Sequence, residues 1–435
     1  MHYATRLSAL ALALGAAFGP ASAQTATPAA EVARLLASPA FKTAAATIDK
    51  EHGRIVEDGI KLAEIPSPPL KEAARAQAYA KMLKDVGLAD VKIDEEGNVL
   101  GVRKGAHGDG KFVVVSAHMD TVFPTGTDVK VKREGSKLKG PGIGDDTMSL
   151  SVLLGFIRAM DAAHITTRDD ILFVGTVGEE GIGNLRGVRH LFTKGEYKGK
   201  LKSFFSVESA DINTVTNAGV GSKRYHIVFK GPGGHSFAAF GLVNPMFALG
   251  SAAQEFGRTQ VPSSPKTTYS IGVIGGGTSV NAIPLSAWMD VDMRSESVAE
   301  LKKVEERLLR IVQDAADAEN KARSTREGKI TVEAQLIGDR PAGTTALDSP
   351  FVQSAKAAIE AGGYKFATKS SSTDSNMAMS LGIPALSIGR MEQDKFGRVH
   401  STDEWIDVEK GPMVKAMTTS LSIILAATGV EAQGK

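Results

Sequence analysis

The chain has 435 residues, enough for two or three domains with well-buried cores. Its formal net charge is +2, and charged residues make up 23% of the chain with both signs mixed along its length. A nucleic-acid partner is therefore not expected, because such partners favour a concentrated basic surface. The chain has no cysteine, which excludes disulfides, thiolate metal ligands and cysteine nucleophiles. Any bound metal must use histidines and carboxylates.

The first 23 residues have the plan of a secretory signal peptide. Arg6 supplies positive charge, residues 7–18 are apolar, and Ala21-Ser22-Ala23 suits cleavage before Gln24. We expect export to a bacterial periplasm, with release from the cell as the alternative. No later apolar run reaches the length of about 18 residues that a spanning helix needs, so no membrane partner is expected. Residues 24–30 are rich in Ala, Thr and Pro and are predicted to be a tether, with folded structure starting near Glu31.

Helical spacing of apolar residues predicts a helix over residues 70–86, which Gly87 ends. Three apolar runs follow, at 111–117, 171–177 and 204–207. Such runs are typical of strands buried on both faces of a mainly parallel sheet. The predicted fold class is therefore α/β, with helices flanking the sheet.

Each of these three runs is followed directly by residues able to bind a metal or move a proton. They are His118 and Asp120 after the first run, Glu179 and Glu180 after the second, and Glu208 after the third. In open α/β sheets ligands bind beyond the carboxyl ends of the strands. The sequence therefore predicts one site that gathers these distant side chains.

From residue 223 the apolar residues alternate, which predicts a half-exposed antiparallel strand over 223–229. Asn244-Pro245 indicates a helix start. Further elements are expected as strands at 268–274 and 287–293, a helix with an apolar stripe from Leu301 to Ala315, and a strand at 330–336. This order resembles a ferredoxin-like α+β plan. We predict that residues 219–337 form a domain inserted into a discontinuous domain made of 31–218 and 338–430.

Zinc catalysis needs nitrogen or oxygen ligands and an open position for water, and two neighbouring ions need a bridging carboxylate. His118 is a candidate ligand, and Asp120 is expected to accept the other ring N–H of that histidine and fix its tautomer. Asp145 lies on a Gly-rich turn before a predicted helix. The adjacent pair Glu179-Glu180 offers one carboxylate for metal and one for protons.

Five motifs occur in order: HMDTV (118–122), GIGDD (142–146), GEEG (178–181), FSVES (205–209) and RVHSTDEW (398–405). Together they resemble the co-catalytic zinc hydrolases that include carboxypeptidase G, peptidase T, aminoacylase and succinyl-diaminopimelate desuccinylase, so a zinc-exopeptidase-like fold is expected. The resemblance covers nearly all of the chain after the signal. It implies two Zn²⁺ per subunit, with Glu179 as general base. The implied ligands are Asp145 as the bridge, His118 and Glu208 in one site, and Glu180 and His400 in the other.

The resemblance also implies that the inserted domain acts as a lid and a dimer interface. His235, in GPGGHS, is then expected to reach the active site of a neighbouring subunit and steady the oxyanion. Asn281 in NAIP and Arg294 in DMR match lid positions that bind the substrate. The chain departs from many members at Thr147-Met148, where they have a Lys-Gly pair, and this leaves the subfamily open. Asp374 is expected either to cap a turn or to shape the substrate pocket, outside the catalytic set.

The expected function is that of an exopeptidase acting on short peptides, although the sequence does not say which terminus it trims. The alternative is an amidohydrolase of N-acyl amino acids or other non-peptide amides. A catalytically silent metal-binding or peptide-binding protein is a third hypothesis, against which Glu179 argues, because a binder needs no base beside its ligands. Zinc is favoured, but Co²⁺ or Mn²⁺ would fit the same ligands.

Overall fold

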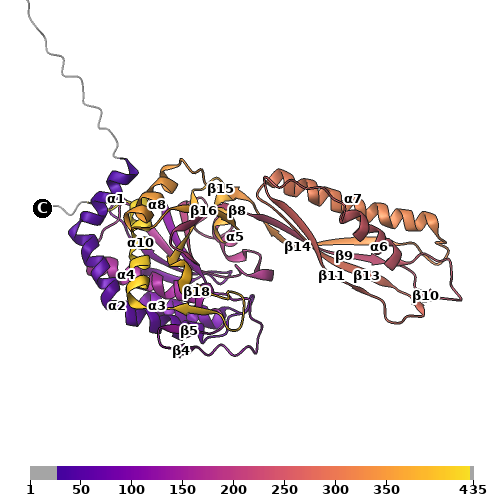
Figure 1. Ribbon diagram of the computed structural model, residues 1–435, viewed down its shortest axis with the longest axis horizontal. Helices are drawn as coiled ribbons and strands as arrows, with labels where there is room; N and C mark the ends of the chain where they lie inside the picture. Colours follow the sequence, from indigo (N-terminus) through magenta and orange to yellow (C-terminus); the bar gives the residue numbers. More distant parts are fainter. Residues whose placement is uncertain (1–26, 432–435) are drawn as a thin grey trace, which may run out of the picture.

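The structure is a computed structural model that describes residues 27–431. Within these residues the chain forms a large sheet with helices on both faces and a smaller sheet that extends away from it (Figure 1). The predicted signal peptide, residues 1–23, lies outside the described residues. The helices are α1 (Pro28–Ala37), α2 (Pro39–Ala63), α3 (Ala73–Asp85), α4 (Met148–Ala162), α5 (Arg186–Thr193), α6 (Pro245–Phe256), α7 (Val298–Ala322), α8 (Pro350–Ala361), α9 (Ser375–Ser380) and α10 (Lys410–Thr428).

The prediction of a tether is wrong for residues 28–30, because α1 begins at Pro28. Thr27 is the N-cap of this helix, and its hydroxyl accepts the N–H of Ala30 at 3.3 Å. A proline suits the first turn of a helix, where its missing N–H leaves no hydrogen bond unmade. The composition that suggested a tether is therefore also that of a helix start.

The large sheet contains nine strands in the described part of the chain, in the order β1-β2-β6-β3-β7-β17-β8-β15, with β16 paired to β8. The pairs β6–β3, β3–β7, β7–β17 and β8–β16 are parallel, which confirms the predicted α/β fold with a mainly parallel sheet. The strands are β1 (Ala89–Ile93), β2 (Val99–Arg103), β3 (Phe112–His118), β6 (Asp170–Thr176), β7 (Leu201–Asp211), β8 (Thr214–Gly219), β15 (Gly343–Thr344), β16 (Ala367–Ser371) and β17 (Ala385–Met391).

The central strand β3 is buried along its whole length, because helices cover both faces of the sheet. Val113 and Val115 pack into one apolar core with α2, α4, α8 and α10. Val114 points to the other face and packs with α5 and α9. This two-sided burial explains why the strand reads as a continuous apolar run instead of an alternating one.

The second sheet is antiparallel and has the order β11-β13-β9-β14. Its strands are β9 (Gly221–Lys230), β11 (Thr267–Gly276), β13 (Ser286–Ser295) and β14 (Thr331–Arg340). Together with α6 and α7 they follow the predicted order strand, helix, strand, strand, helix, strand. Both helices pack on one face around a separate apolar core. We call residues 221–340 the inserted unit.

Two details of the inserted unit follow from its sequence pattern. The side chain of Asn244 accepts the N–H of Met246 at 2.9 Å, which makes it the N-cap of α6 as predicted. The last strand, β14, continues to Arg340, beyond the strand end predicted at residue 336. Most of β14 is exposed on both faces, so its alternation of apolar residues is weak and did not reveal its full length.

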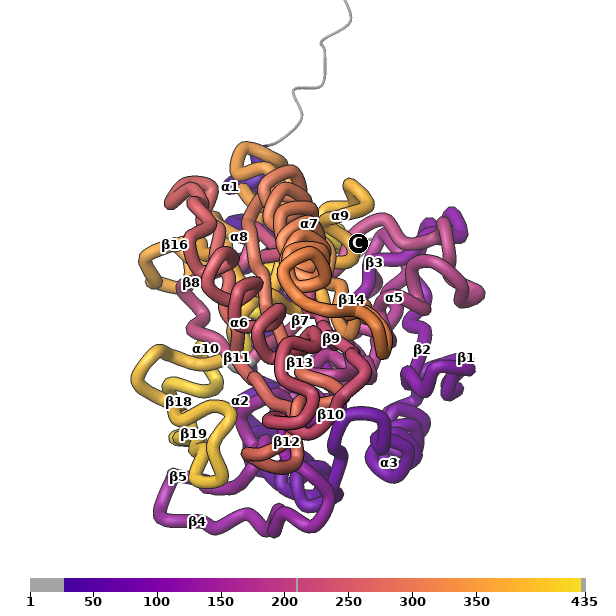
Figure 2. The backbone as a smooth tube through the Cα atoms, turned by 90° about the vertical axis from the view of Figure 1, so that its right-hand side faces the viewer, coloured from indigo at the N-terminus to yellow at the C-terminus, as the bar shows by residue number. Residues whose placement is uncertain are grey.

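Two small sheets complete the described structure. One has the order β18-β19-β5-β4 and contains β4 (Lys132–Glu134), β5 (Lys137–Lys139), β18 (Phe396–Gly397) and β19 (Trp405–Asp407). The other pairs β10 (Gly234–His235) with β12 (Ala282–Ile283). Figure 2 views the molecule from the side of the inserted unit and places β1 and β2 at one side of the molecule, with β18 and β19 at the other.

Candidate metal centre

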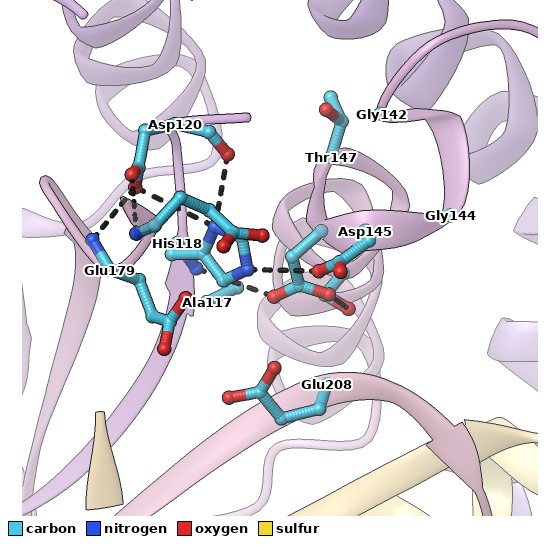
Figure 3. A network of polar contacts seen from close by, with 12 residues as sticks. Ala117, His118, Asp120, Gly142, Gly144, Asp145, Thr147, Glu179 and Glu208 are labelled. Carbon is cyan, nitrogen blue, oxygen red and sulfur yellow. Dashed lines mark hydrogen bonds and ion pairs between the residues drawn. The ribbon is translucent and has the colours of Figure 1, made fainter. Parts of the chain in front are cut away.

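The predicted ligand His118 is the last residue of β3 and is fully buried. Its Nε2 lies 3.0 Å from Oδ1 of Asp145, and its Nδ1 lies 3.0 Å from the main-chain oxygen of Asp120. Figure 3 shows the ring between these two residues. The ring therefore has a fixed orientation, with Nδ1 held by the turn after β3 and Nε2 facing the carboxylate of Asp145.

The prediction that the carboxylate of Asp120 accepts the ring N–H of His118 needs a correction. Oδ1 of Asp120 is 3.6 Å from Nδ1, whereas the main-chain oxygen is closer. Both carboxylate oxygens instead accept backbone N–H groups, from Glu179 at 3.0 Å and from Glu180 at 2.7 Å. Asp120 thus ties the turn after β6 to the turn after β3.

Asp145 lies between the two predicted histidine ligands. Its Oδ1 faces Nε2 of His118, and its Oδ2 lies 3.2 Å from Nε2 of His400. The same nitrogen of His400 is 2.8 Å from Oε1 of Glu180. The ligand atoms of His118, Asp145 and Glu180 all lie within 4.8 Å of one another, so these three form a candidate metal-binding group.

Glu208 belongs to a second candidate group, together with His118 and Asp146. Sequence reasoning treated Asp146 only as part of a motif, because adjacent aspartates give no signal that separates their roles. Asp146 is fully buried, and its Oδ2 accepts the N–H of His118 at 3.3 Å. Glu208 lies inside β7, one residue beyond the predicted strand 204–207, and its Oε1 accepts the hydroxyl of Ser206 at 2.7 Å.

Several carboxyl groups at this centre have raised pKa values. Burial raises the pKa of Asp146 and of Glu179 well above the ordinary range, and the charge of Glu180 adds to the effect on Glu179. Burial also raises the pKa of Glu208. Buried carboxyl groups with raised pKa values lie close together here. A nearby positive charge would be needed to stabilise their ionised forms.

Arg340, the last residue of β14, is a buried partner of Glu179 that sequence reasoning missed. Its Nη1 lies 3.2 Å from Oε1 of Glu179 and 3.2 Å from the hydroxyl of Ser372, and its Nη2 donates to the main-chain oxygen of Glu179. A lone arginine at the end of a strand has no spacing that predicts this contact. Only the fold brings it there.

Asp374, which the sequence placed outside the catalytic set, is buried near the end of β6. Its Oδ2 accepts the hydroxyl of Thr176 at 2.5 Å. Burial raises the pKa of Asp374 to about 7. The residue lies close enough to His118 for their charges to interact, which makes it part of the surroundings of the centre.

The predicted oxyanion residue His235 and the predicted substrate-binding residue Asn281 are not brought to His118 and Asp145 within the chain. His235 and Asn281 lie beside each other where β10 pairs with β12, at the end of the unit farthest from the large sheet (Figure 1). Both are exposed. Arg294 lies on β13 and forms an ion pair with Asp292 at 2.8 Å.

A family model described as Peptidase family M20/M25/M40 matches residues 114–424. The chain belongs to this family. The match includes His118, Glu180 and Glu208, and it also includes His400. It confirms the family predicted from the five motifs.

Individual proteins of known sequence or structure are also similar to this chain. Succinyl-diaminopimelate desuccinylase of Leptothrix cholodnii is 26% identical over 227 residues, which cover 48% of this chain and 57% of that protein. The chain thus matches a little over half the length of that curated relative. Aminopeptidase PepT of Bacillus cereus has a TM-score of 0.70 at 21% identity, covering 87% of this chain and 99% of its own. YXEP of Bacillus subtilis, described as a dinuclear metal-binding peptidase of the M20 family, has a TM-score of 0.62 at 17% identity and the same coverage. These two structures share the fold.

In the described range 27–431, no helix is long and apolar enough to cross a membrane.

Proposed function

We propose that this M20/M25/M40 family member hydrolyses amide bonds of short peptides as an exopeptidase and uses two Zn²⁺ ions held by His118, Asp145, Glu180, Glu208 and His400. The observation that carries the proposal is the position of Asp145. Its two carboxylate oxygens face two different histidines, at 3.0 Å and 3.2 Å. A carboxylate that bridges two ions needs one oxygen directed to each ion and its ligands.

The residues fit a pair of divalent cations. The donors are imidazole nitrogens and carboxylate oxygens, which suit zinc and, with the same geometry, cobalt or manganese. Without a cation the centre holds several buried carboxyl groups close together, and burial raises the pKa of Asp146, Glu179 and Glu208. Bound cations would compensate this charge, so the centre is best explained as a cation site.

When bound, the two ions would polarise the substrate carbonyl and acidify a water molecule. Glu179 would act as the base that takes a proton from the attacking water and delivers it to the leaving nitrogen. Arg340 holds the carboxylate of Glu179 at 3.2 Å and so restricts its orientation. Asp120 fixes the turn that carries Glu179 and Glu180 through their backbone N–H groups.

His235 is proposed to act from a second subunit of a homodimer, where its ring would donate to the oxyanion. Its Nδ1 accepts the N–H of Phe237 at 3.2 Å and that of Ala238 at 3.4 Å, which leaves Nε2 as the protonated nitrogen of the neutral ring. Asn281 lies beside it, and Arg294 is exposed on β13; both are proposed to bind the substrate. Export to the periplasm or to the medium remains part of the proposal.

The proposed substrate class follows from the proteins that this chain resembles, which are described as peptidases and as a desuccinylase. Short peptides are favoured by the similarity to an aminopeptidase over 87% of this chain. The alternative, hydrolysis of N-acyl amino acids or other non-peptide amides, is supported by the similarity to a desuccinylase. Both reactions need the same base and the same cations.

The test starts from protein purified from Gln24 onward, with bound metal quantified and dipeptides and N-acyl amino acids assayed before and after chelation and zinc restoration. We expect about two Zn²⁺ per subunit, with activity lost on chelation and regained with zinc. Replacement of Glu179 by Ala should lower kcat by about 10²–10⁴-fold without changing metal content. Turnover of acyl amino acids alone would favour the alternative function. Absence of bound metal, or full activity of the E179A variant, would refute the mechanism.

A further inference from the structure

Glu404 is a buried acid that the proposed mechanism does not use. It lies four residues after His400 and has only 1% of its surface exposed. Its Oε1 accepts the N–H groups of Gly144 and Asp145, both at 2.7 Å, and its Oε2 accepts the N–H of Gly142 at 3.3 Å. One carboxylate thus holds three backbone N–H groups of the turn that carries Asp145.

The main chain of Glu404 makes a further contact with the same segment. Its carbonyl oxygen accepts the N–H of Gly140 at 2.9 Å. The next residue, Trp405, pairs with Lys139 where β19 lies against β5. The segment around Glu404 is therefore attached to residues 137–145 through both its backbone and its side chain.

The turn is also held from its opposite side by Arg390, which is fully buried on β17. Its Nη2 donates to the main-chain oxygen of Gly144, and its Nε lies 2.5 Å from the hydroxyl of Ser149. The N–H of Gly144 is held by Glu404 and its carbonyl by Arg390. The peptide groups before Asp145 therefore have little freedom to rotate.

We propose that Glu404 is a positioning residue that sets Asp145 between the two metal sites and couples its turn to the loop of His400. This inference rests on the proposed two-metal function. Loss of a group that orients a metal ligand through hydrogen bonds commonly changes metal affinity by about 10–100-fold. Glu404 holds the turn that carries Asp145 and belongs to the loop that carries His400. Its replacement should therefore disturb the positions of both proposed ligands.

The test measures metal affinity, because a merely structural role would not change it selectively. Glu404→Gln keeps the size of the side chain but replaces one acceptor oxygen by an amide N–H₂ group. This group cannot accept a hydrogen bond from the backbone N–H that it faces, so at least one contact with the turn is lost. We expect the Kd for Co²⁺, followed by the visible spectrum of the bound ion, to rise by about 10–100-fold in this variant. Hydrogen exchange of the peptide containing residues 142–145 should also accelerate in the metal-free protein.

Asp403→Asn is the matched control. Asp403 is the neighbouring acid, is exposed, and pairs with Arg398 at 2.6 Å. The control should bind Co²⁺ as the parent does. Equal Co²⁺ affinity in the parent and in the E404Q variant, with equal exchange of residues 142–145, would overturn the role of Glu404 alone. A parent protein that binds no Co²⁺ would overturn the proposed function and this inference together.

Discussion

Arg75 has no exposed surface although its guanidinium group is charged. It lies on α3 and donates to the main-chain oxygens of Ile65 and Met119, both at 2.7 Å, and to the hydroxyl of Thr147 at 3.0 Å. Met119 directly follows His118, and Thr147 directly follows Asp146. A single side chain therefore connects the segment after α2 with two turns of the proposed metal centre.

Replacing Arg75 by Met should lower the free energy of unfolding by about 3 kcal/mol, because buried carbonyl groups lose a charged donor while the aliphatic stem is kept. Urea unfolding of the metal-free protein measures this change. Lys84→Met on the exposed side of the same helix is the control, and its effect should stay within about 0.5 kcal/mol. Equal stability of the two variants would show that water replaces the guanidinium without loss.

At the scale of elements, the inserted unit contains its own apolar core. Ile227 and Phe229 on the inner strand β9 are fully buried against α6 and α7, in a cluster separate from the cores of the large sheet. The edge strands β11 and β14 carry much of the exposed surface of this sheet. A unit with its own core can lose stability without affecting its neighbour.

Replacing Phe229 by Ala should therefore destabilise the inserted unit by about 3–5 kcal/mol. Hydrogen exchange should accelerate in β9, β11 and β13, while β3, β6 and β7 exchange as in the parent. Val273→Ala, at a half-exposed position of β11, should leave both regions unchanged. Acceleration across the large sheet as well would contradict the predicted division at residues 219–337.

At the scale of the whole molecule, the end of the inserted unit that carries β10, which we call its tip, lies far from the large sheet (Figure 1). His235 is at this tip, whereas Glu179 follows β6 of the large sheet. If His235 takes part in the reaction, a second subunit must supply it, which makes an active homodimer a testable consequence.

Co-expression of the variants Glu179→Ala and His235→Ala tests this arrangement. Each variant alone should be nearly inactive. Random pairing should restore about a quarter of the parental activity, because half of the dimers are mixed and only one of the two sites in each mixed dimer has both an intact Glu179 and an intact His235 from the partner. Activity no higher than that of the separate variants would exclude a role in trans.

The sequence predicted those features that rest on repeated patterns or on motifs. Apolar runs located β3, β6 and β7, and the alternation over 223–229 located β9. Single contacts could not be predicted in this way. Arg340 reaches Glu179, and Glu404 reaches the turn of Asp145, only because the fold joins segments that are far apart in the chain. The helix start at Pro28 was missed because its composition also fits a tether.

The order of the proposed ligands along the chain limits how early during synthesis a metal ion could bind. His118 precedes the whole inserted unit, and His400 follows it near the C-terminal end. A growing chain therefore cannot present the complete set until the inserted unit and the segment through His400 have been made, and contacts between such distant segments form slowly. Ions bound by this set would enter only after His400 has been made, so the compartment in which folding ends, and not the one in which the chain is made, would determine which metal the proposed site acquires.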